Sequence, residues 1–353
     1  MPLLPPPRRL LSVLLTVAVA TLGGAVFWLL QVPLAWMLGS MAATGLLTWH
    51  ERATVPPPLR PAALIMLGLG LGQTFTAPVM AALALSFGWL VLAGLLSIVA
   101  GALTSRLFAR IAGTDAATGY YASVPGGVVV MAILAGRAGV SVPAVTLAQT
   151  IRVMIVVVLV PPLITWLAPR GGAATAAFLA DRPEVHLAGL AALLPGGLLA
   201  GLLAGRVGLA NPWMLGPCCL MIALSTAGML PSGVPMWMVD AAQVGLGMAL
   251  GNRISRSFLL SARRLAVASA VTTLLLVALM AAMAVGYALV SGLPLGAVLL
   301  GMSPGGMPEM TITAKALELG VPLVLGFHLV RMLVCNLTVA PIWRLAVRLG
   351  LAR

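Results

Sequence analysis

The stretch that decides the fold is residues 123–153, which read SVPGGVVVMAILAGRAGVSVPAVTLAQTIRV. It begins with a Pro-Gly-Gly triplet at 125–127 and continues through two apolar runs, the second of which contains Arg152. A proline lacks a backbone N–H, and two glycines weaken a helix further. The triplet therefore predicts a break in a helix that the apolar residues on either side would otherwise continue.

The whole chain has the composition of an all-α polytopic membrane protein. Of its 353 residues, 61% are hydrophobic and only 8% are charged, which a water-soluble protein of this length cannot hide in its core. Apolar runs follow one another, and we expect about 10–12 membrane segments. The run after Arg8 and Arg9 is too long for a signal peptide, so we expect an uncleaved first helix. The net charge of +13 comes from arginines between the runs, as the positive-inside rule predicts, and we expect no direct contact with nucleic acid.

The sequence also contains an internal repeat of about 180 residues, the kind of signal that reveals a duplicated fold. Residues 123–127 read SVPGG and residues 302–306 read MSPGG, an offset of 179. The tetrapeptide WMLG begins at both Trp36 and Trp213. We therefore expect two tandem membrane repeats at residues 1–172 and 186–353, joined by a linker at 173–185.

The arginines predict how the two repeats face the membrane. If all segments of each repeat cross, both copies have the same orientation, and the arginines between residues 253 and 264 lie outside, against the positive-inside rule. If one segment per repeat fails to cross fully, the copies are inverted and nearly all basic loops are cytoplasmic. We favour inverted repeats, which are common among secondary transporters with interrupted helices. We then expect cytoplasmic N- and C-termini in a multi-pass protein of the inner membrane.

The two PGG triplets are the first candidate site, and each is expected to lie in a broken or re-entrant helix. Free backbone groups at membrane depth are tolerated only where protein or a water-filled cavity surrounds them. The triplet residues are Pro125, Gly126 and Gly127, and their counterparts Pro304, Gly305 and Gly306. They either bind a solute or ion with half-helix ends, or form packing kinks. A third triplet at 195–197 has no repeat counterpart, and we interpret it as an ordinary loop.

Two arginines lie deep in the apolar helices that follow the triplets. They are Arg152 and Arg331, which the offset of 179 also relates. An arginine at the bilayer centre costs about 2.5 kcal/mol or more, so each should meet a partner or a cavity rather than lipid. The expected partners are carbonyls at the helix break or an anionic solute, whose geometry a guanidinium suits. These two roles are compatible.

Three further residues join the candidate site. Gln149 and His328 each precede an arginine by three residues and share its helical face, either as site residues or as hydrogen-bonded structural groups. Glu309 follows the second triplet and has no acidic counterpart in the first repeat. It is either a group that couples transport to protons or cations, or a partner of Lys315 or Arg331.

The helix after the first triplet contains Gln149-Thr-Ile-Arg152 and ends with Pro161-Pro162. Together with the duplicated triplet, this pattern resembles the AbrB-type membrane protein family, and the resemblance extends through both repeats. The family is described as a membrane duplication, and its members carry names as regulators of gene expression and as ammonia monooxygenases. The second repeat departs from the pattern with His328 in place of Gln149. The break-then-helix pattern is also similar, at the level of fold alone, to cation/proton antiporters and bile-acid-type transporters.

These observations predict a secondary transporter for a small solute, which is anionic if the arginines bind it. The alternative is a membrane-bound regulator that changes gene expression indirectly, because the short loops leave no domain to contact DNA. We expect no enzyme, metal or cofactor, since an oxygenase needs clustered ligands and His50, His186 and His328 show no HxH or HxxxH spacing. The expected partners are the lipid bilayer and the solute, and a homodimer stays open.

Overall fold

The computed structural model describes residues 7–167, 173–179, 183–209, 211–253 and 262–349. Helices form on every apolar segment that the sequence predicts, and the described residues contain no strand. The protein is therefore all-α, as expected. It consists of two compact units, each of which takes helices from both halves of the chain.

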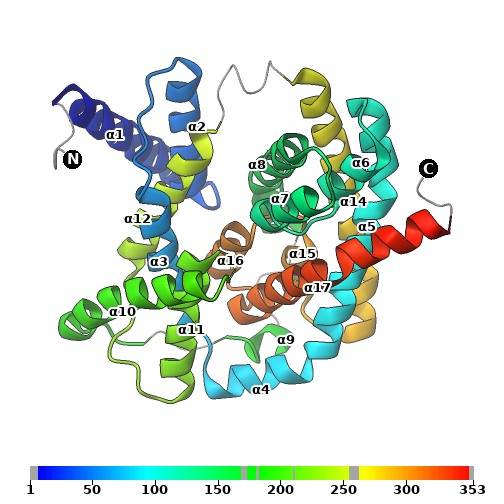
Figure 1. The fold of residues 1–353 in the computed structure, drawn as a ribbon. Helices are drawn as coiled ribbons and strands as arrows, with labels where there is room; N and C mark the ends of the chain where they lie inside the picture. The colour runs from blue at the N-terminus through cyan, green and yellow to red at the C-terminus, as the bar shows by residue number, and fades with distance from the viewer. Residues whose placement is uncertain (1–6, 168–172, 180–182, 210, 254–261, 350–353) are drawn as a thin grey trace. The chain divides into compact units, whose positions relative to one another are not determined.

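Unit 1 comprises Met1–Ala77 and Ala180–Ser261. Its helices are α1 (Pro7–Leu29), α2 (Ala35–Trp49), α3 (Leu59–Gly72), α10 (Leu187–Arg206), α11 (Pro212–Thr226) and α12 (Met236–Gly251) (Figure 1). Gly39 of α2 lies so close to Gly23 of α1 that a Cβ on either residue would collide with the other backbone. Small residues at helix contacts allow such close approach in membranes, where the lipid offers no hydrophobic drive for association.

Unit 2 comprises Pro78–Leu179 and Ala262–Arg353. Its helices from the first half are α4 (Ala77–Leu85), α5 (Phe87–Ala112), α6 (Ala116–Ser123), α7 (Val128–Arg137), α8 (Val142–Leu167) and the short α9 (Ala173–Ala176). Its helices from the second half are α14 (Arg263–Ser291), α15 (Leu295–Met302), α16 (Met307–Ala316) and α17 (Val321–Arg348). All of the residues predicted for the site lie in this unit.

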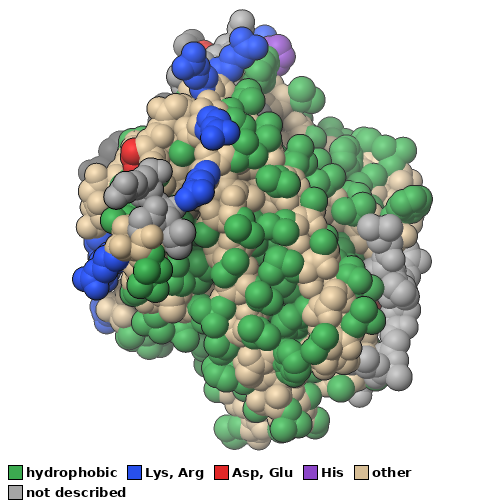
Figure 2. Space-filling model, turned by 90° about the vertical axis from the view of Figure 1, so that its right-hand side faces the viewer, with side chains coloured by type: hydrophobic (Ala, Val, Ile, Leu, Met, Phe, Trp, Pro, Cys, Tyr) green, Lys and Arg blue, Asp and Glu red, His purple; other side chains and the backbone are tan. Residues whose placement is uncertain are grey.

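Six helices of the described residues are long and apolar enough to cross a membrane: α1, α5, α8, α10, α14 and α17. The bent pair α3 and α4 is a seventh candidate. The remaining helices of the described chain are shorter than the hydrocarbon core requires at about 1.5 Å of rise per residue. On the face shown in Figure 2, hydrophobic side chains are spread over the surface, while the Lys and Arg side chains lie in its upper and left parts. This is a surface suited to lipid.

Both repeated PGG triplets break a helix, as predicted. Residues 124–127 separate α6 from α7, and residues 303–306 separate α15 from α16. Gly127 has a φ of 88°, a backbone conformation that side chains of L-residues disfavour, and it begins α7 as its N-cap. Asp115 begins α6 and accepts a hydrogen bond from the Thr118 amide at 2.7 Å.

The helices around the two breaks follow the predicted spacing. The helices α6, α7 and α8 begin at residues 116, 128 and 142, and α15, α16 and α17 begin at residues 295, 307 and 321, which is 179 later in each case. The two repeats at residues 1–172 and 186–353, the linker at 173–185 and the inverted orientation stay predictions. The compact units do not follow those boundaries, because each unit combines helices from both predicted repeats.

One expectation about the triplets is wrong. The triplet at 195–197 is not a loop, because α10 continues through Pro195, and Gly197 packs against Ile65 and Leu69 of α3. A proline removes one helical hydrogen bond, but packing on both sides holds the axis. Ser86 separates α4 from α5.

Candidate functional site

The first break is held by a side chain from α8. Nε2 of Gln149 lies 3.1, 3.0 and 2.9 Å from the carbonyl oxygens of Tyr121, Ala122 and Val124. The last carbonyls of any helix lack partners within the helix, and Pro125 has no N–H to offer. Gln149 therefore supplies the donor that the end of α6 needs.

The second break is held by an arginine from α17. Nη1 of Arg331 donates to the Ser303 carbonyl at 2.6 Å, and Nη2 donates to the Gly305 carbonyl at 3.1 Å. Both carbonyls lie just beyond the end of α15, where the negative end of the helix dipole favours a cation. The two breaks thus use the same solution with different donors.

Arg152 joins the two breaks. Its Nε donates to the Pro304 carbonyl at 3.0 Å, and its Nη1 donates to the Val124 carbonyl at 3.2 Å. The first carbonyl belongs to the second break and the other to the first. Residues that are far apart in the sequence therefore meet at one centre inside unit 2. Hydrogen bonds to carbonyls are one of the two roles expected of this arginine.

His328 lies beside Arg331. The distance between Nδ1 of His328 and Nη2 of Arg331 is 2.8 Å, and a guanidinium can only donate. Nδ1 is therefore the acceptor, so the imidazole is neutral and carries its proton on Nε2. In the first repeat, Gln149 contacts backbone carbonyls instead, and the two halves of the centre are chemically different.

Glu309 makes the centre more asymmetric. Its side chain is 5% exposed, and it is the only buried carboxylate of the described residues. It occupies the first turn of α16, and a Cβ on Gly306 would collide with its Oε2, so the carboxylate folds over the beginning of its own helix. The positive end of a helix favours an anion there. The equivalent position in α7 is Val130, which offers no such charge.

The remaining triplet residues shape the breaks. Gly126 lies against the side chain of Met131, and Gly305 lies against that of Met310, so a Cβ at either position would meet a methionine. The space next to Gly127 is open. Gly126 and Gly305 are thus needed for close packing against the methionines as much as for their conformational freedom.

The centre has two buried positive charges. Arg152 is 3% exposed and Arg331 is 6% exposed, and neither forms an ion pair with a carboxylate of the described residues. The carbonyl ends of α6 and α15 each contribute a partial charge of only about −0.5. A buried charge without full compensation is costly, so the centre favours an added anion.

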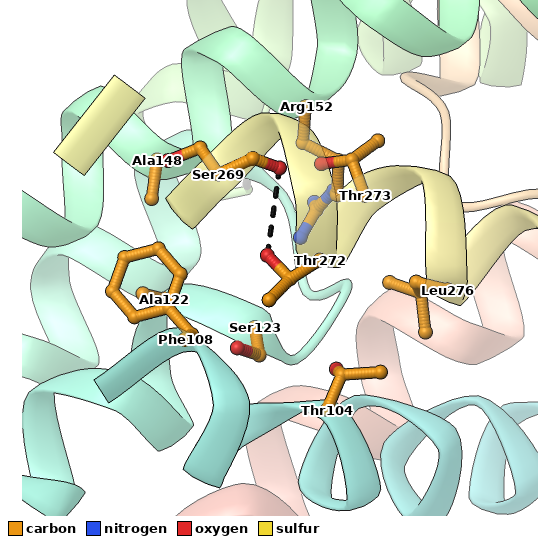
Figure 3. Close-up of a pocket in the computed structure, with 10 residues that line it drawn as sticks. All are labelled: Thr104, Phe108, Ala122, Ser123, Ala148, Arg152, Ser269, Thr272, Thr273 and Leu276. Carbon is orange, nitrogen blue, oxygen red and sulfur yellow. Dashed lines mark hydrogen bonds between the residues drawn. The ribbon is translucent and has the colours of Figure 1, made fainter. Parts of the chain in front are cut away.

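A small cavity of about 10 Å³, with room for about one water molecule, adjoins Arg152 (Figure 3). It is lined by Thr104, Phe108, Ala122, Ser123, Ala148, Arg152, Ser269, Thr272, Thr273 and Leu276. These residues come from α5, the end of α6, α8 and α14. Figure 3 shows the guanidinium of Arg152 pointing from α8 toward the hydroxyl groups.

The five hydroxyl residues of this cavity are absent from the sequence prediction, and Arg152 is the one predicted site residue that lines it. A signal for three of them exists: Ser269, Thr272 and Thr273 follow a spacing of three and four residues in an apolar helix, which places them on one face. The described residues contain no group of three or more His, Cys, Asp or Glu side chains that could hold a metal ion.

The fold and the centre define a class, the polytopic α-helical membrane proteins with paired broken helices. A family model described as Transition state regulatory protein AbrB matches residues 36–347, and the chain belongs to this family, as the resemblance predicted. The chain is 24% identical to YhjN of Bacillus subtilis (strain 168), a protein described as uncharacterized, over 96% of this chain and 94% of the relative. It is 23% identical to an Escherichia coli (strain K12) protein that carries the provisional name regulator AbrB, over 88% of this chain and 90% of the relative.

Proposed function

We propose that this protein is a secondary transporter for a small anionic solute, with its site where the two broken helices of unit 2 meet. The observation that carries the proposal is the position of Arg152, which donates to the Val124 carbonyl of one break and the Pro304 carbonyl of the other. Transporters commonly bind their substrates at the interrupted ends of membrane helices, near the centre of the bilayer.

The charge of the centre supports an anionic solute. Two guanidinium groups without a carboxylate partner among the described residues lie beside backbone carbonyls, and one of them borders a cavity. A guanidinium binds a carboxylate or phosphate through short, directional hydrogen bonds. In this proposal, Arg152 contacts the solute, while Arg331 holds the second break and adds positive potential.

Glu309 is the group that we assign to coupling. It is a buried carboxylate at the second break, and its protonation would change the charge next to the solute. The neutral His328 and the carbonyl-bound Gln149 keep the two breaks in place. The site is therefore asymmetric, with an acid on one side alone.

Transport into proteoliposomes tests the proposal. The probes are radiolabelled L-lactate, propionate and inorganic phosphate. We expect Arg152→Gln to lower the flux of the transported probe at least about tenfold, the effect of one lost charge-assisted hydrogen bond. Arg152→Lys should retain part of the flux because it keeps the charge. Arg344→Gln is the matched control, since Arg344 is exposed near the end of α17.

Purified Arg152→Gln protein must first elute as a single species, which shows that it inserts and folds. If this variant then transports every probe at the rate of the unaltered protein, the assignment of the site is wrong. If the unaltered protein moves none of the probes faster than protein-free liposomes do, the transporter function loses its support.

The second candidate function is a membrane-bound regulator of gene expression that acts indirectly, which the name of the Escherichia coli relative favours. Arg152→Gln in the native host separates the two. If regulation depends on transport, Arg152→Gln should lose both the solute flux and the effect of the unaltered protein on gene expression. If Arg152→Gln loses the solute flux but affects gene expression as the unaltered protein does, the result favours a role as a regulator that does not depend on transport.

We also propose that the two halves are inverted repeats in the inner membrane, with both termini in the cytoplasm. Labelling of single cysteines placed at the exposed residues 31, 77, 231 and 292 tests this orientation. Reagents that do not cross the membrane should reach these positions from outside. Native mass spectrometry of the detergent-solubilised protein tests for a homodimer.

A further inference from the structure

We propose that the cavity beside Arg152 binds one water molecule, which joins the first break to the hydroxyl groups of α5 and α14. The water accepts hydrogen bonds from Arg152 and Ser123, and it donates hydrogen bonds to threonine and serine oxygens. This inference goes beyond the proposed function, because it stands whether or not the protein transports a solute.

The size of the cavity limits the ligand. Its volume of about 10 Å³ is room for about one water molecule, and all ten residues that line it are at most 5% exposed. A solute of several atoms does not fit there. Such a solute can contact Arg152 through this cavity only if α5, α8 and α14 move apart.

The cavity offers donors without acceptors on one side. Arg152 uses Nε and one hydrogen of Nη1 for the two carbonyls, and its Nη2 hydrogens make no hydrogen bond with the described residues. Oγ of Ser123, a residue that is 5% exposed, also lacks a hydrogen-bond partner in the described part of the chain. A buried donor without an acceptor is costly, so both groups favour a ligand whose lone pairs can accept from them.

The other polar groups of the cavity offer acceptors. The hydroxyl groups of Thr104, Ser269 and Thr272 donate to carbonyls of their own helices, at 2.9, 2.7 and 2.6 Å. Their hydrogens are therefore engaged, and the remaining lone pairs of the oxygens can only accept. A chloride ion is also small, but it has no hydrogen to donate and would face these lone pairs. Water both accepts and donates, so it satisfies both sets of groups.

The bound water has two consequences for unit 2. It solvates the guanidinium of Arg152, which has no carboxylate partner among the described residues, and hydrogen bonds to a buried charge offset part of its desolvation. It also connects the two halves of the chain, because Arg152 and Ser123 belong to the first half and α14 belongs to the second.

X-ray radiolytic footprinting of the full-length protein in lipid nanodiscs tests the inference. X-rays split bound water into hydroxyl radicals, which oxidise the side chains next to it even where burial excludes bulk water. Phe108 lines the cavity and Phe327 does not, although each is 1% exposed. We expect oxidation of Phe108 and none of Phe327, and we expect the same result in sodium chloride and in sodium gluconate.

Ala148→Val is the informative variant, because its added methyl groups fill a cavity that has room for about one water molecule. We expect the oxidation of Phe108 to fall to that of Phe327. Ala144→Val is the matched control, since Ala144 lies one turn earlier on α8 and does not line the cavity. This control should retain the oxidation of Phe108.

A second variant covers the case in which Ala148→Val fails to elute as a single species. Thr272→Val replaces a hydroxyl group with a methyl group of similar size and removes one acceptor of the water, so it should lower the oxidation of Phe108. Thr338→Val is its control. Thr338 of α17 makes the same hydrogen bond to its own helix, at 2.7 Å, and does not line the cavity.

The outcomes separate this inference from the proposed function. Equal oxidation of Phe108 and Phe327 in the unaltered protein overturns the water site, and so does full oxidation of Phe108 in the folded variants. Loss of the oxidation in chloride alone would mean that an anion occupies the cavity instead of water. If the expected oxidation occurs without flux in proteoliposomes, the water site stands and the transporter function does not.

Discussion

The end of α6 gives the sharpest test of how the first break is stabilised. Gln149 is fully buried, and its Nε2 reaches three carbonyl oxygens that the break leaves without helical partners. In Gln149→Met the side chain keeps its length and loses the two N–H donors that the three carbonyls share. The variant should retain the packing of α8 against α6 and remove only the polar contacts.

Two independent estimates give the size of the effect. Hydrogen bonds between membrane helices contribute about 0.6 kcal/mol each, so the two N–H groups of Gln149, shared among three carbonyls, are worth about 1–2 kcal/mol. The Val124 carbonyl also accepts from Arg152 and from the Gly126 amide, so Gln149→Met strands two carbonyls, those of Tyr121 and Ala122. At about 1–3 kcal/mol for each unsatisfied group, the second estimate begins at about 2 kcal/mol as well. We therefore expect the free energy of unfolding to fall by about 2 kcal/mol.

Reversible unfolding in mixed detergent micelles measures this free energy. Thr146→Val is the control, because Thr146 lies on the same helix and should change stability by less than about 0.5 kcal/mol. The reasoning is refuted if Gln149→Met and the control have the same stability. It is also refuted if the variant lowers stability without increasing hydrogen exchange at the end of α6.

Changes at four further positions have defined outcomes. Asp115→Ala should destabilise α6 by about 1 kcal/mol, measured by unfolding, and Asp115→Asn should restore most of the loss. Burial raises the pKa of Asp115, but hydrogen bonds from Thr118 outweigh this effect and hold the pKa below its usual value. The difference in stability between Asp115→Ala and the unaltered protein should therefore shrink as the pH falls below that usual value. Glu309→Gln should make flux in proteoliposomes insensitive to an imposed pH gradient, and a full response would exclude Glu309 from coupling. A Cβ at Gly101 would crowd the first break, so Gly101→Ala should cost about 1–3 kcal/mol, whereas Gly286→Ala, which meets open space, should stabilise α14 by about 0.5–1 kcal/mol in the same assay.

The helix breaks could be predicted from the sequence because their cause is local. A proline followed by two glycines removes a hydrogen bond and weakens the helix wherever it occurs. The triplet at 195–197 shows the limit of this reasoning, since α10 continues through it. The triplet at 125–127 differs from the triplet at 195–197 in its tertiary contacts, because Gln149 and Arg152 donate hydrogen bonds to the first break. No local sequence pattern predicts that these side chains reach the break.

The candidate site was predictable in part for a similar reason. A buried arginine in an apolar run is unusual enough to mark Arg152 and Arg331 at once. The hydroxyl groups of Ser123, Thr104 and Thr272 carry no such signal, because serine and threonine are common in membrane helices and usually bond to their own backbone. Only the packing of α5, α8 and α14 around one cavity brings them together.

The hydrogen bond from Arg152 to Pro304 has a consequence for biosynthesis. The two residues are 152 positions apart, so a ribosome that adds about 5–20 residues per second needs about 8–30 s to supply the carbonyl after it has made the arginine. During that interval α8 carries a guanidinium that has only the first of its two carbonyl partners, that of Val124. The insertion machinery must therefore keep this helix in contact with water, or release it into the bilayer only when the second half of the chain arrives.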